Sequence, residues 1–480
     1  MKKVIIEICS FVIIFAVMIS TAFRFLSFKD TGGGGGFQNY YSTESGLIDV
    51  LFLGSSHAHC TVNNSKLWND AGISSFTLSS GNQSIDTSYI FLNEALKTQH
   101  PKIVFVETYT FDTTNTDNDT INIYRSSLLP KWHPSSLMYG LSLQEDYGFD
   151  NTTLEELYLR FPITHSRYED LKSTDFCNYY PYKRGYLGST ETGSVNLGIT
   201  TDATTKLNAK TQKYMDMMIS RCKEENIRLI FFCAPYNITE DAYAYQNSIG
   251  EYAVAKGAEF YNMNSPEYIS LFDGNTDFRY DEHLNNSGAD KATQILEDII
   301  VSSGMVEDHR GDEAYSEWDD DLTFMKDRML CFDLYTDGLE LPEYLTYLTT
   351  YDSSRYKIIV ALAGDYKVLG TDSYNMFEPI GIDANEYSMG GVFLDGAPYT
   401  VSDDHSYIDL GENECSIVYD KESSNCKLYY GIEEYAECQN GAVMLIYDTE
   451  ISAPVDAVYL DYYNFGLQIL RDDNIEVVGN

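Results

Sequence analysis

Two short segments, far apart in the chain, carry side chains that together can perform acyl transfer. The first, residues 49–57 (Asp-Val-Leu-Phe-Leu-Gly-Ser-Ser-His), is typical of a buried strand that ends in a tight turn and presents Ser56. The second, residues 280–288 (Tyr-Asp-Glu-His-Leu-Asn-Asn-Ser-Gly), offers Asp281 and His283 just before a helix. A nucleophile, a general base and an orienting carboxylate make up a serine-type acyl-transfer site. We therefore predict that Ser56 attacks a carbonyl carbon, that His283 takes its proton and that Asp281 fixes the histidine tautomer.

Other residues in the second segment leave alternatives open. Asp277 and Glu282 are further carboxylates within reach of His283, and Asn286 or Ser287 can cap the helix that follows. The same Asp-x-His spacing recurs at residues 403–405, where no nucleophile turn accompanies it, so we interpret that copy as incidental.

Candidate oxyanion donors follow the second predicted strand. Gly81 and Asn82 lie in the stretch Leu-Ser-Ser-Gly-Asn-Gln-Ser, residues 78–84. A glycine N–H, an amide side chain and the backbone N–H of Ser56 are suitable donors to a developing oxyanion. An ordinary strand-to-helix turn uses the same residue types, and it remains the alternative.

A long polar segment, residues 112–200, interrupts the predicted core strands and is typical of a lid or a substrate wall. It contains His165 and Arg167, which we propose with His57 as substrate-binding residues. A guanidinium in so acidic a chain is suited to a carboxylate or phosphate on a glycan or carrier. The alternative for Arg167 is a structural ion pair with Glu169 or Asp170.

The elements that must position these residues alternate between strand and helix. Apolar runs of strand length occur at 48–53, 76–78, 102–107, 227–233 and 260–262, and helical spacing occurs at 84–98, 203–225 and 289–301. Strands separated by helices predict an α/β fold, with a parallel sheet covered by helices on both faces.

On these residues, the stretch 45–303 resembles the SGNH/GDSL hydrolase superfamily, and within it the membrane-anchored bacterial branch of DltD-like and alginate O-acetylation proteins. The likeness rests on Val50-Leu-Phe-Leu-Gly-Ser-Ser-His57, Leu78-Ser-Ser-Gly81 and Asp281-Glu-His283-Leu-Asn. It implies a flavodoxin-like three-layer sheet and a triad of Ser56, His283 and Asp281, with Gly81 as an oxyanion donor and with neither metal nor cofactor. It also implies an extracytoplasmic O-acyltransferase, most often an O-acetyltransferase, or an esterase of cell-envelope glycans that works beside a membrane-bound O-acyltransferase.

Two departures from that family's pattern qualify the comparison. The usual Gly-x-Asn-Asp block is missing, and Glu107-Thr108-Tyr109 stands in its place. The acid also precedes the histidine by two residues instead of three, as it does in the alginate-acetylation branch. A secreted carbohydrate esterase and a non-catalytic glycan-binding scaffold with the same fold are the rival functions.

The N-terminus predicts attachment to a membrane. A mostly apolar run, residues 4–23, follows Met-Lys-Lys and is long enough to span a bilayer, so we expect an uncleaved anchor over 1–30 in the bacterial cell membrane, with the catalytic part outside. A five-glycine run then predicts a flexible tether over 31–44. With 73 acidic and 32 basic side chains, the net charge of −41 excludes nucleic acid as a partner.

The C-terminal third predicts a separate accessory domain. An acidic stretch at 304–325 is expected to be a linker, and residues 326–480 combine strand-like runs at 329–334 and 356–363, a helix at 341–349 and β-rich segments near Val392, Ile417, Leu445 and Ala457. This part resembles the interleukin-like (PANDER-like) domain, which implies a carbohydrate- or protein-binding role. Cys415, Cys426 and Cys438 could supply one disulfide in an oxidising exterior, or could be small buried side chains.

Overall fold

The chain divides into two compact units, 1–322 and 323–480, in the computed structural model. The residues that the structure describes are 2–26, 40–112, 168, 183–335, 338–364, 370–371, 374–383, 391–399, 405–411, 414–420, 423 and 425–472. The two units are described separately below.

Unit 1 is built on a five-stranded sheet in which every pair of neighbours is parallel. The strand order is β2-β1-β3-β4-β5. The strands are β1 (Val50–Gly54), β2 (Ser75–Ser79), β3 (Ile103–Glu107), β4 (Arg228–Cys233) and β5 (Glu259–Asn262). The parallel α/β sheet predicted from the sequence is therefore confirmed, with strand ends shifted by one or two residues.

Alternate residues of the central strands enter two different cores, as the period of a strand requires. In β1, Leu51 and Leu53 belong to one buried cluster, whereas Val50 and Phe52 belong to another. Both faces of the sheet are thus buried, which explains the uninterrupted apolar runs in the sequence.

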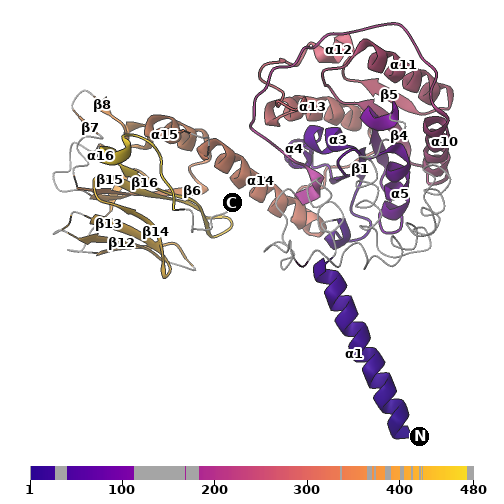
Figure 1. The fold of residues 1–480 in the computed structure, drawn as a ribbon. Helices are drawn as coiled ribbons and strands as arrows, with labels where there is room; N and C mark the ends of the chain where they lie inside the picture. The colour runs from indigo at the N-terminus through magenta and orange to yellow at the C-terminus, as the bar shows by residue number, and fades with distance from the viewer. Residues whose placement is uncertain are drawn as a thin grey trace. The chain divides into compact units, whose positions relative to one another are not determined.

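Helices cover both faces of this sheet (Figure 1). Residues of α5, α10 and α11 pack in the first cluster, and residues of α13 pack in the second. The helices and 3₁₀ turns of unit 1 beyond α1 are α3 (Ser56–Thr61), α4 (Asn64–Ala71), α5 (Ile85–Ala95), η1 (Tyr109–Asp112), η4 (Lys183–Gly185), α10 (Ala209–Glu224), α11 (Glu240–Ala255), α12 (Pro266–Ile269), α13 (Asn286–Ser303) and η5 (Glu313–Tyr315).

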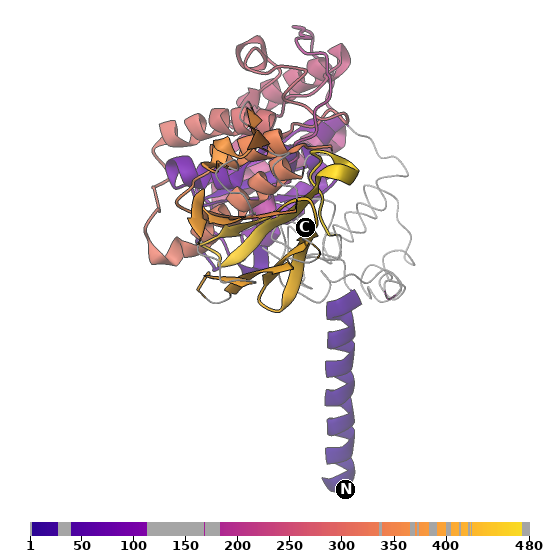
Figure 2. The same ribbon diagram turned by 90° about the vertical axis from the view of Figure 1, so that its left-hand side faces the viewer.

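The N-terminal segment forms one helix, α1 (Lys2–Leu26), which is continuous in both views (Figures 1 and 2). In the part of the chain that the structure describes, no helix combines the length and the apolar character that a membrane span needs. The membrane anchor expected over 1–30 therefore has a helix but no structural support as a span.

Parts of the expected tether 31–44 and of the expected linker 304–325 pack in the core of unit 1. The five-glycine run lies outside the described residues, but Tyr40, within the expected tether 31–44, is buried and donates a hydrogen bond to the carbonyl of Ala95 (2.7 Å). The expected linker 304–325 instead contains η5 and the start of a long helix, and its Tyr315 and Trp318 pack in the first cluster. Aromatic side chains within these polar stretches explain the difference, because burying them outweighs the polarity of their neighbours.

Unit 2 consists of a helical layer, two main antiparallel sheets and the two-stranded antiparallel sheet β7-β8 (Figure 1). The larger sheet has the order β10-β9-β6-β15-β16, and the smaller has the order β11-β12-β13-β14. One cluster lies between the larger sheet and the helices, and another lies between the two sheets. Its helices and turns are α14 (Ser316–Leu334, which begins in unit 1), α15 (Leu341–Thr350), η7 (Glu378–Ile380) and α16 (Tyr462–Phe465). Its strands are β6 (Tyr356–Ala363), β7 (Gly370–Thr371), β8 (Tyr374–Asn375), β9 (Gly391–Leu394), β10 (Ala397–Tyr399), β11 (His405–Asp409), β12 (Glu414–Asp420), β13 (Asn425–Tyr430), β14 (Glu433–Cys438), β15 (Gly441–Asp448) and β16 (Ala453–Asp461).

Most predicted elements of unit 2 are present, with one exception. The helix predicted at 341–349 is α15, and the β-rich segments fall on β6, β9, β12, β15 and β16. The strand predicted at 329–334 is wrong, because these residues form the last turns of α14, whose Leu330 and Leu334 are one helical turn apart and both buried.

The three cysteines considered for a disulfide, Cys415, Cys426 and Cys438, are buried free thiols, although Cys426 and Cys438 face each other across β13 and β14. The structure therefore contains no disulfide among Cys415, Cys426 and Cys438.

Candidate active site

A glycine creates the turn that presents the nucleophile. Gly54 ends β1 with φ +153°, a conformation that side chains rarely adopt. A Cβ atom there would lie 2.5 Å from the Cβ of Glu107 on the neighbouring strand β3 and 3.0 Å from the Cβ of Ala58. The chain can therefore leave the sheet at this point only without a side chain.

Ser55 and Ser56 have different roles after that turn. Ser55 is fully buried and is the N-cap of α3, where its hydroxyl accepts a hydrogen bond from the backbone N–H of His57 (3.2 Å). Ser56 is the first residue of the helix and is partly exposed, so its hydroxyl is accessible. Ser55 therefore caps the helix, and the hydroxyl of Ser56 is not needed for capping.

The predicted base reaches the predicted nucleophile. The Nε2 atom of His283 lies 2.7 Å from the Oγ atom of Ser56, within hydrogen-bond range. His283 belongs to a short loop that precedes α13, and Phe278 and Leu284 form a β-bridge at the base of this loop. The two segments singled out in the sequence thus meet at the carboxyl edge of the sheet.

Asp281 lies beside the other nitrogen of the imidazole. Its Oδ1 is 3.2 Å from His283 Nδ1 and 3.4 Å from the backbone N of His283. Glu282, between them, has φ +69°, and this left-handed residue turns the chain so that its two neighbours face each other. The contact has the length of an ion pair but not the alignment of a hydrogen bond, since Nδ1 is buried without a hydrogen-bond partner.

An arginine that the sequence reasoning missed also holds this aspartate. Arg279 Nη2 donates to Asp281 Oδ2 at 2.9 Å. Partial burial raises the pKa of Asp281, but the charges of His283 and Arg279 outweigh it and leave the pKa below its ordinary value. Asp281 is therefore ionised at neutral pH, as an orienting carboxylate must be.

The alternative carboxylates point elsewhere. Asp277 is buried and accepts hydrogen bonds from Ser287 (2.7 Å) and Lys291 (2.5 Å) of α13. Glu282 accepts a hydrogen bond from the side chain of Asn237 (3.1 Å). Neither contact involves His283.

The helix cap differs from the prediction. The N-cap of α13 is Asn285, whose side chain accepts from the backbone N–H of Gly288 at 3.2 Å, and not Asn286 or Ser287. Asn286 Oδ1 instead accepts from Tyr186 (2.8 Å) and from the backbone of Ser189 (3.0 Å). A run of polar residues before a helix offers several possible caps, and the tertiary partners of this one decide among them.

Aromatic rings stack behind His283, the predicted general base. The ring of His57 lies 4.5 Å from that of His283 on one side and 3.9 Å from that of Tyr109 on the other, each pair tilted by only 29°. Tyr236 meets the edges of His57 and Tyr109. His57, proposed as a substrate-binding residue, is buried and its ring packs against those of His283 and Tyr109, and its part in substrate binding stays a prediction.

The two histidines of α3 are uncharged. Burial, together with the charge of His283, lowers the pKa of His57 well below its ordinary value. The same causes, with Arg279, lower the pKa of His59 to about 3, and its Nδ1 pairs with the hydroxyl of Ser79 (3.0 Å). In the neutral form His57 offers an uncharged face to the catalytic ring.

Gly81 and Asn82 lie at the same edge of the sheet as Ser56. The register pairs Gly54 with Ser79, and the N–H of Ser80 reaches the carbonyl of Gly54 (3.4 Å). Gly81 is partly exposed in the turn that follows, and Asn82 is exposed with φ +52°. Gly81 and Asn82 thus follow β2 close to the turn that presents Ser56, a location suited to oxyanion donors. Their role as donors stays a prediction.

Glu107, in place of the family's missing block, is a second residue whose importance the sequence did not indicate. It is buried at the end of β3, accepts a hydrogen bond from the hydroxyl of Ser55 (Oε2, 2.9 Å) and another from the backbone N–H of Tyr109 (Oε1, 2.6 Å). Burial raises its pKa to about 7, although hydrogen bonds from Tyr109 and Ser55 oppose that shift. The signals in the sequence were a glutamate at the end of an otherwise apolar strand and its position where the family's missing block would stand.

Other predicted residues are not placed at the site. His165 and Arg167 lie outside the described residues, as do Glu169 and Asp170. The described end of the insertion does approach the site, where Leu187 donates to the carbonyl of His59 (2.8 Å) and Glu191 lies 3.6 Å from Arg279. His405 belongs to β11 of unit 2.

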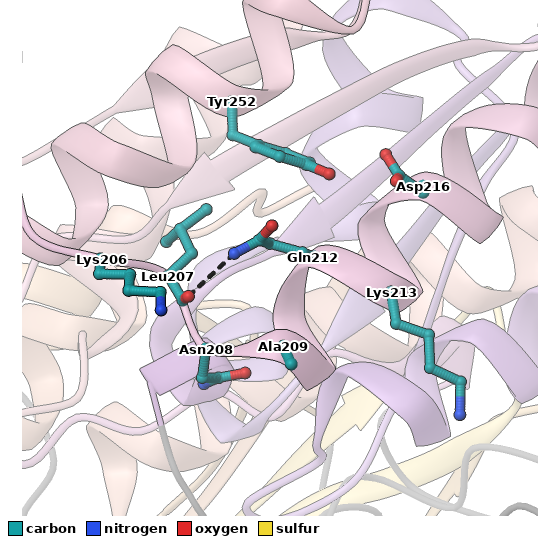
Figure 3. A pocket seen from close by; sticks show the side chains of 8 residues that line it. All are labelled: Lys206, Leu207, Asn208, Ala209, Gln212, Lys213, Asp216 and Tyr252. Carbon is teal, nitrogen blue, oxygen red and sulfur yellow. Dashed lines mark hydrogen bonds between the residues drawn. The ribbon is translucent and has the colours of Figure 1, made fainter.

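A hollow elsewhere in unit 1 is separate from these residues (Figure 3). It has a volume of about 660 Å³ and lies beside the start of α10 and Tyr252 of α11. Gln212 spans it with a hydrogen bond to the carbonyl of Leu207 (2.9 Å), and none of the predicted catalytic residues lines it.

The described ranges contain no group of three or more His, Cys, Asp or Glu side chains arranged to hold a metal ion. In a comparison with known proteins, no protein-family model and no curated protein matches the chain.

Proposed function

We propose that this protein is a serine-dependent O-acyltransferase or esterase of the SGNH type, with Ser56 as nucleophile, His283 as general base and Asp281 as the orienting carboxylate. The observation that carries the proposal is the 2.7 Å contact between Ser56 Oγ and His283 Nε2, at the carboxyl edge of a parallel sheet. Ligands bind at this edge in open α/β folds, which supports the assignment.

The first half of the reaction forms an acyl-enzyme. Ser56 Oγ attacks the carbonyl carbon of an ester while its proton passes to His283 Nε2. The resulting oxyanion faces the backbone N–H of Ser56 and that of Gly81, and Asp281 stabilises the imidazolium by its negative charge. His283 then gives the proton to the departing alcohol, and the acyl group stays on Ser56.

The second half transfers the acyl group to an acceptor hydroxyl. His283 now removes the proton of a sugar hydroxyl or of water while that oxygen attacks the acyl carbon, and it returns the proton to Ser56 Oγ as the bond between Ser56 and the acyl group breaks. Transfer and hydrolysis differ only in this acceptor. The family resemblance favours an O-acetyl group and an exported or cell-envelope glycan.

The surroundings of the enzyme belong to the same proposal. A membrane-bound O-acyltransferase that supplies acyl groups is the partner implied by the resemblance, and the extracytoplasmic side of the bacterial membrane is the location it implies. Fractionation of cells that express the full chain, followed by protease treatment of intact cells, tests the location. Recovery of the protein in the cytosolic fraction would contradict it.

Labelling with a serine-directed fluorophosphonate, together with hydrolysis of a small acetyl ester, tests the catalytic assignment. The wild-type protein should be labelled once, at Ser56. Ser56→Ala and His283→Ala should lose several orders of magnitude in kcat/KM. Ser55→Ala separates the two serines: it removes the cap, weakens the fold by about 1 kcal/mol and should lower kcat/KM far less than Ser56→Ala, because it keeps the nucleophile.

The result that would sink the proposal is a folded wild-type protein that neither reacts with the probe nor hydrolyses the ester. That outcome would favour the glycan-binding scaffold. If Ser55 were essential and Ser56 dispensable, the nucleophile would be misassigned. Addition of a sugar acceptor separates the two enzymes, because a transferase forms the acetylated sugar in preference to free acetate.

A further inference from the structure

We infer that Glu107 is a positioning residue that holds the nucleophile turn and the support of the catalytic histidine in one arrangement. It touches none of the reacting atoms. The inference rests on the proposed function, because it assigns Glu107 a part in the geometry of Ser56 and His283.

The first contact of Glu107 fixes the nucleophile. Its Oε2 accepts the proton of the Ser55 hydroxyl at 2.9 Å, so the remaining lone pairs of that hydroxyl face the backbone N–H of His57. Ser55 is the residue directly before Ser56 and is fully buried. With Gly54 packed against the Cβ of Glu107, the turn is held from two sides.

The second contact supports the base. Oε1 accepts from the backbone N–H of Tyr109 at 2.6 Å, at the start of η1. The ring of Tyr109 lies 3.9 Å from that of His57, which in turn lies 4.5 Å from that of His283. One carboxylate oxygen thus acts on Ser56 through Ser55, and the other acts on His283 through Tyr109 and His57. Ser56 Oγ and His283 Nε2 are the two atoms that lie 2.7 Å apart.

The neighbours of Glu107 explain why a different residue cannot substitute easily. Thr108, which follows it, is already engaged: its hydroxyl donates to Gln246 (2.7 Å) and its N–H to the carbonyl of Phe232 (2.9 Å). In the segment that stands in place of the family's asparagine block, the hydroxyl and the N–H of Thr108 are thus already used in hydrogen bonds within the protein. A side chain with two acceptors, at the end of β3, is what links the turn to η1.

Kinetics of two variants test the inference. Glu107→Ala removes both acceptors and should lower kcat by about 100-fold, the loss expected from a small misplacement of reacting groups, with KM nearly unchanged. Glu107→Gln keeps the shape, an acceptor for Tyr109 and a polar partner for Ser55, and should retain most of kcat. An unchanged kcat in Glu107→Ala, or a loss in Glu107→Gln as large as in Glu107→Ala, would overturn the inference.

A matched control comes from the opposite end of β1, the strand that leads into the turn held by Glu107. Asp49 precedes β1, is buried, and pairs with Lys102 (3.0 Å) and His309 (2.9 Å). Asp49→Asn also changes a buried carboxylate of unit 1 but lies far from the turn along β1. It should lower the melting temperature while leaving kcat of the folded enzyme unchanged. A comparable loss of kcat in Asp49→Asn would show that the effect of Glu107 is general destabilisation.

A spectroscopic measurement separates this inference from the proposed function. In protein with isotope-labelled histidine, the ring signals of His57 and His283 should both move in Glu107→Ala and stay in place in Asp49→Asn. If the wild-type protein proves inactive, the proposed function fails and these signals alone decide the role of Glu107. Unmoved signals in Glu107→Ala would refute that role, whatever the activity.

Discussion

Asp281 is held differently from the other two residues of the triad. Its side chain is 47% exposed, it shares its charge with Arg279, and its contact with His283 Nδ1 is not aligned as a hydrogen bond. Exposure and a competing partner weaken what a carboxylate contributes to an imidazolium. Of the three proposed catalytic residues, Asp281 is thus the one whose contact with its partner is weakest.

We therefore expect Asp281→Asn to lower kcat by less than the roughly 10⁴-fold loss that replacement of a buried triad aspartate causes. Ester hydrolysis at pH 7, with Ser56→Ala as the reference for complete loss, measures this. Asp277→Asn, which alters the buried partner of Lys291, should leave kcat of the folded enzyme intact. A larger loss in Asp277→Asn than in Asp281→Asn would return the role of the acid to Asp277.

Glu107 gives the fold a pH dependence whose sign can be stated. Its pKa of about 7 in the folded protein exceeds the ordinary value of 4.5, so the folded state binds the proton more tightly than the unfolded state. The resulting stability is present below pH 4.5 and is lost as the pH rises through 7, by about 3 kcal/mol at most.

Glu107→Gln removes that dependence. Relative to wild type, the melting temperature of this variant should improve as the pH rises from 5 to 8. Thermal unfolding of both proteins over this range measures the difference. A constant difference in melting temperature would show that Glu107 does not titrate there.

The sequence predicted the two side chains that the structure brings into contact, Ser56 and His283, but not the residues that hold them in place. Ser56 and His283 could be found because each lies at the end of a strand or the start of a helix, in a local pattern. Arg279 and Glu107 could not, because their roles depend on the left-handed turn at Glu282 and on the pairing of β1 with β3. Neither the left-handed conformation of Glu282 nor the pairing of these two strands can be read from the neighbouring residues in the sequence.

At the scale of elements, the site depends on the close approach of β1 and β3. Their register pairs Leu53 with Val106, so the turn after β1 emerges beside the end of β3. Gly54 makes this approach possible, since a Cβ atom would lie 2.5 Å from that of Glu107. Packing of two backbones is thus as much a part of the site as its polar groups.

Gly54→Ala should cost roughly 2–5 kcal/mol, from a clash and from backbone strain together. Gly257→Ala is the control, because Gly257 has φ +86° but open space around its Cβ position, and it should cost only about 1 kcal/mol. Denaturant unfolding of both variants provides the comparison. Equal losses would mean that the contact with Glu107 relaxes without cost.

Element types were predictable where periodicity was long or burial complete. The five parallel strands of unit 1 and helix α15 were found in this way. The error at 329–334 arose because six apolar-rich residues, taken without the turns of α14 before them, resemble a strand. Tyr40 and Trp318 were missed because single aromatic anchors in polar stretches leave no periodic pattern.

At the scale of the whole molecule, each unit has hydrophobic cores of its own. The division falls between Leu322 and Thr323, inside α14. The predicted boundary lay in the same region, but an acidic composition suggested a linker where the chain is helical. Two sets of cores predict two cooperative transitions on heating.

Leu445→Ala should lower one of these transitions and leave the other in place. Leu445 is buried in β15, in the cluster between the sheets of unit 2, and its truncation should cost about 2–5 kcal/mol. Calorimetry resolves the transitions, and ester hydrolysis below the lower transition should be unaffected. Leu53→Ala in β1 is the reciprocal control. A single transition that shifts as a whole in both variants would mean that the units unfold together.

The ring stack behind His283 has a consequence for handedness. His57 covers one face of the proposed catalytic imidazole, at 4.5 Å, so a substrate that contacts this ring can do so only on its other face. An acyl group approached from one side only becomes a tetrahedral centre of one configuration. The protein should therefore distinguish mirror images: of two phosphonate probes that differ only in configuration at phosphorus, one should react with Ser56 much faster than the other.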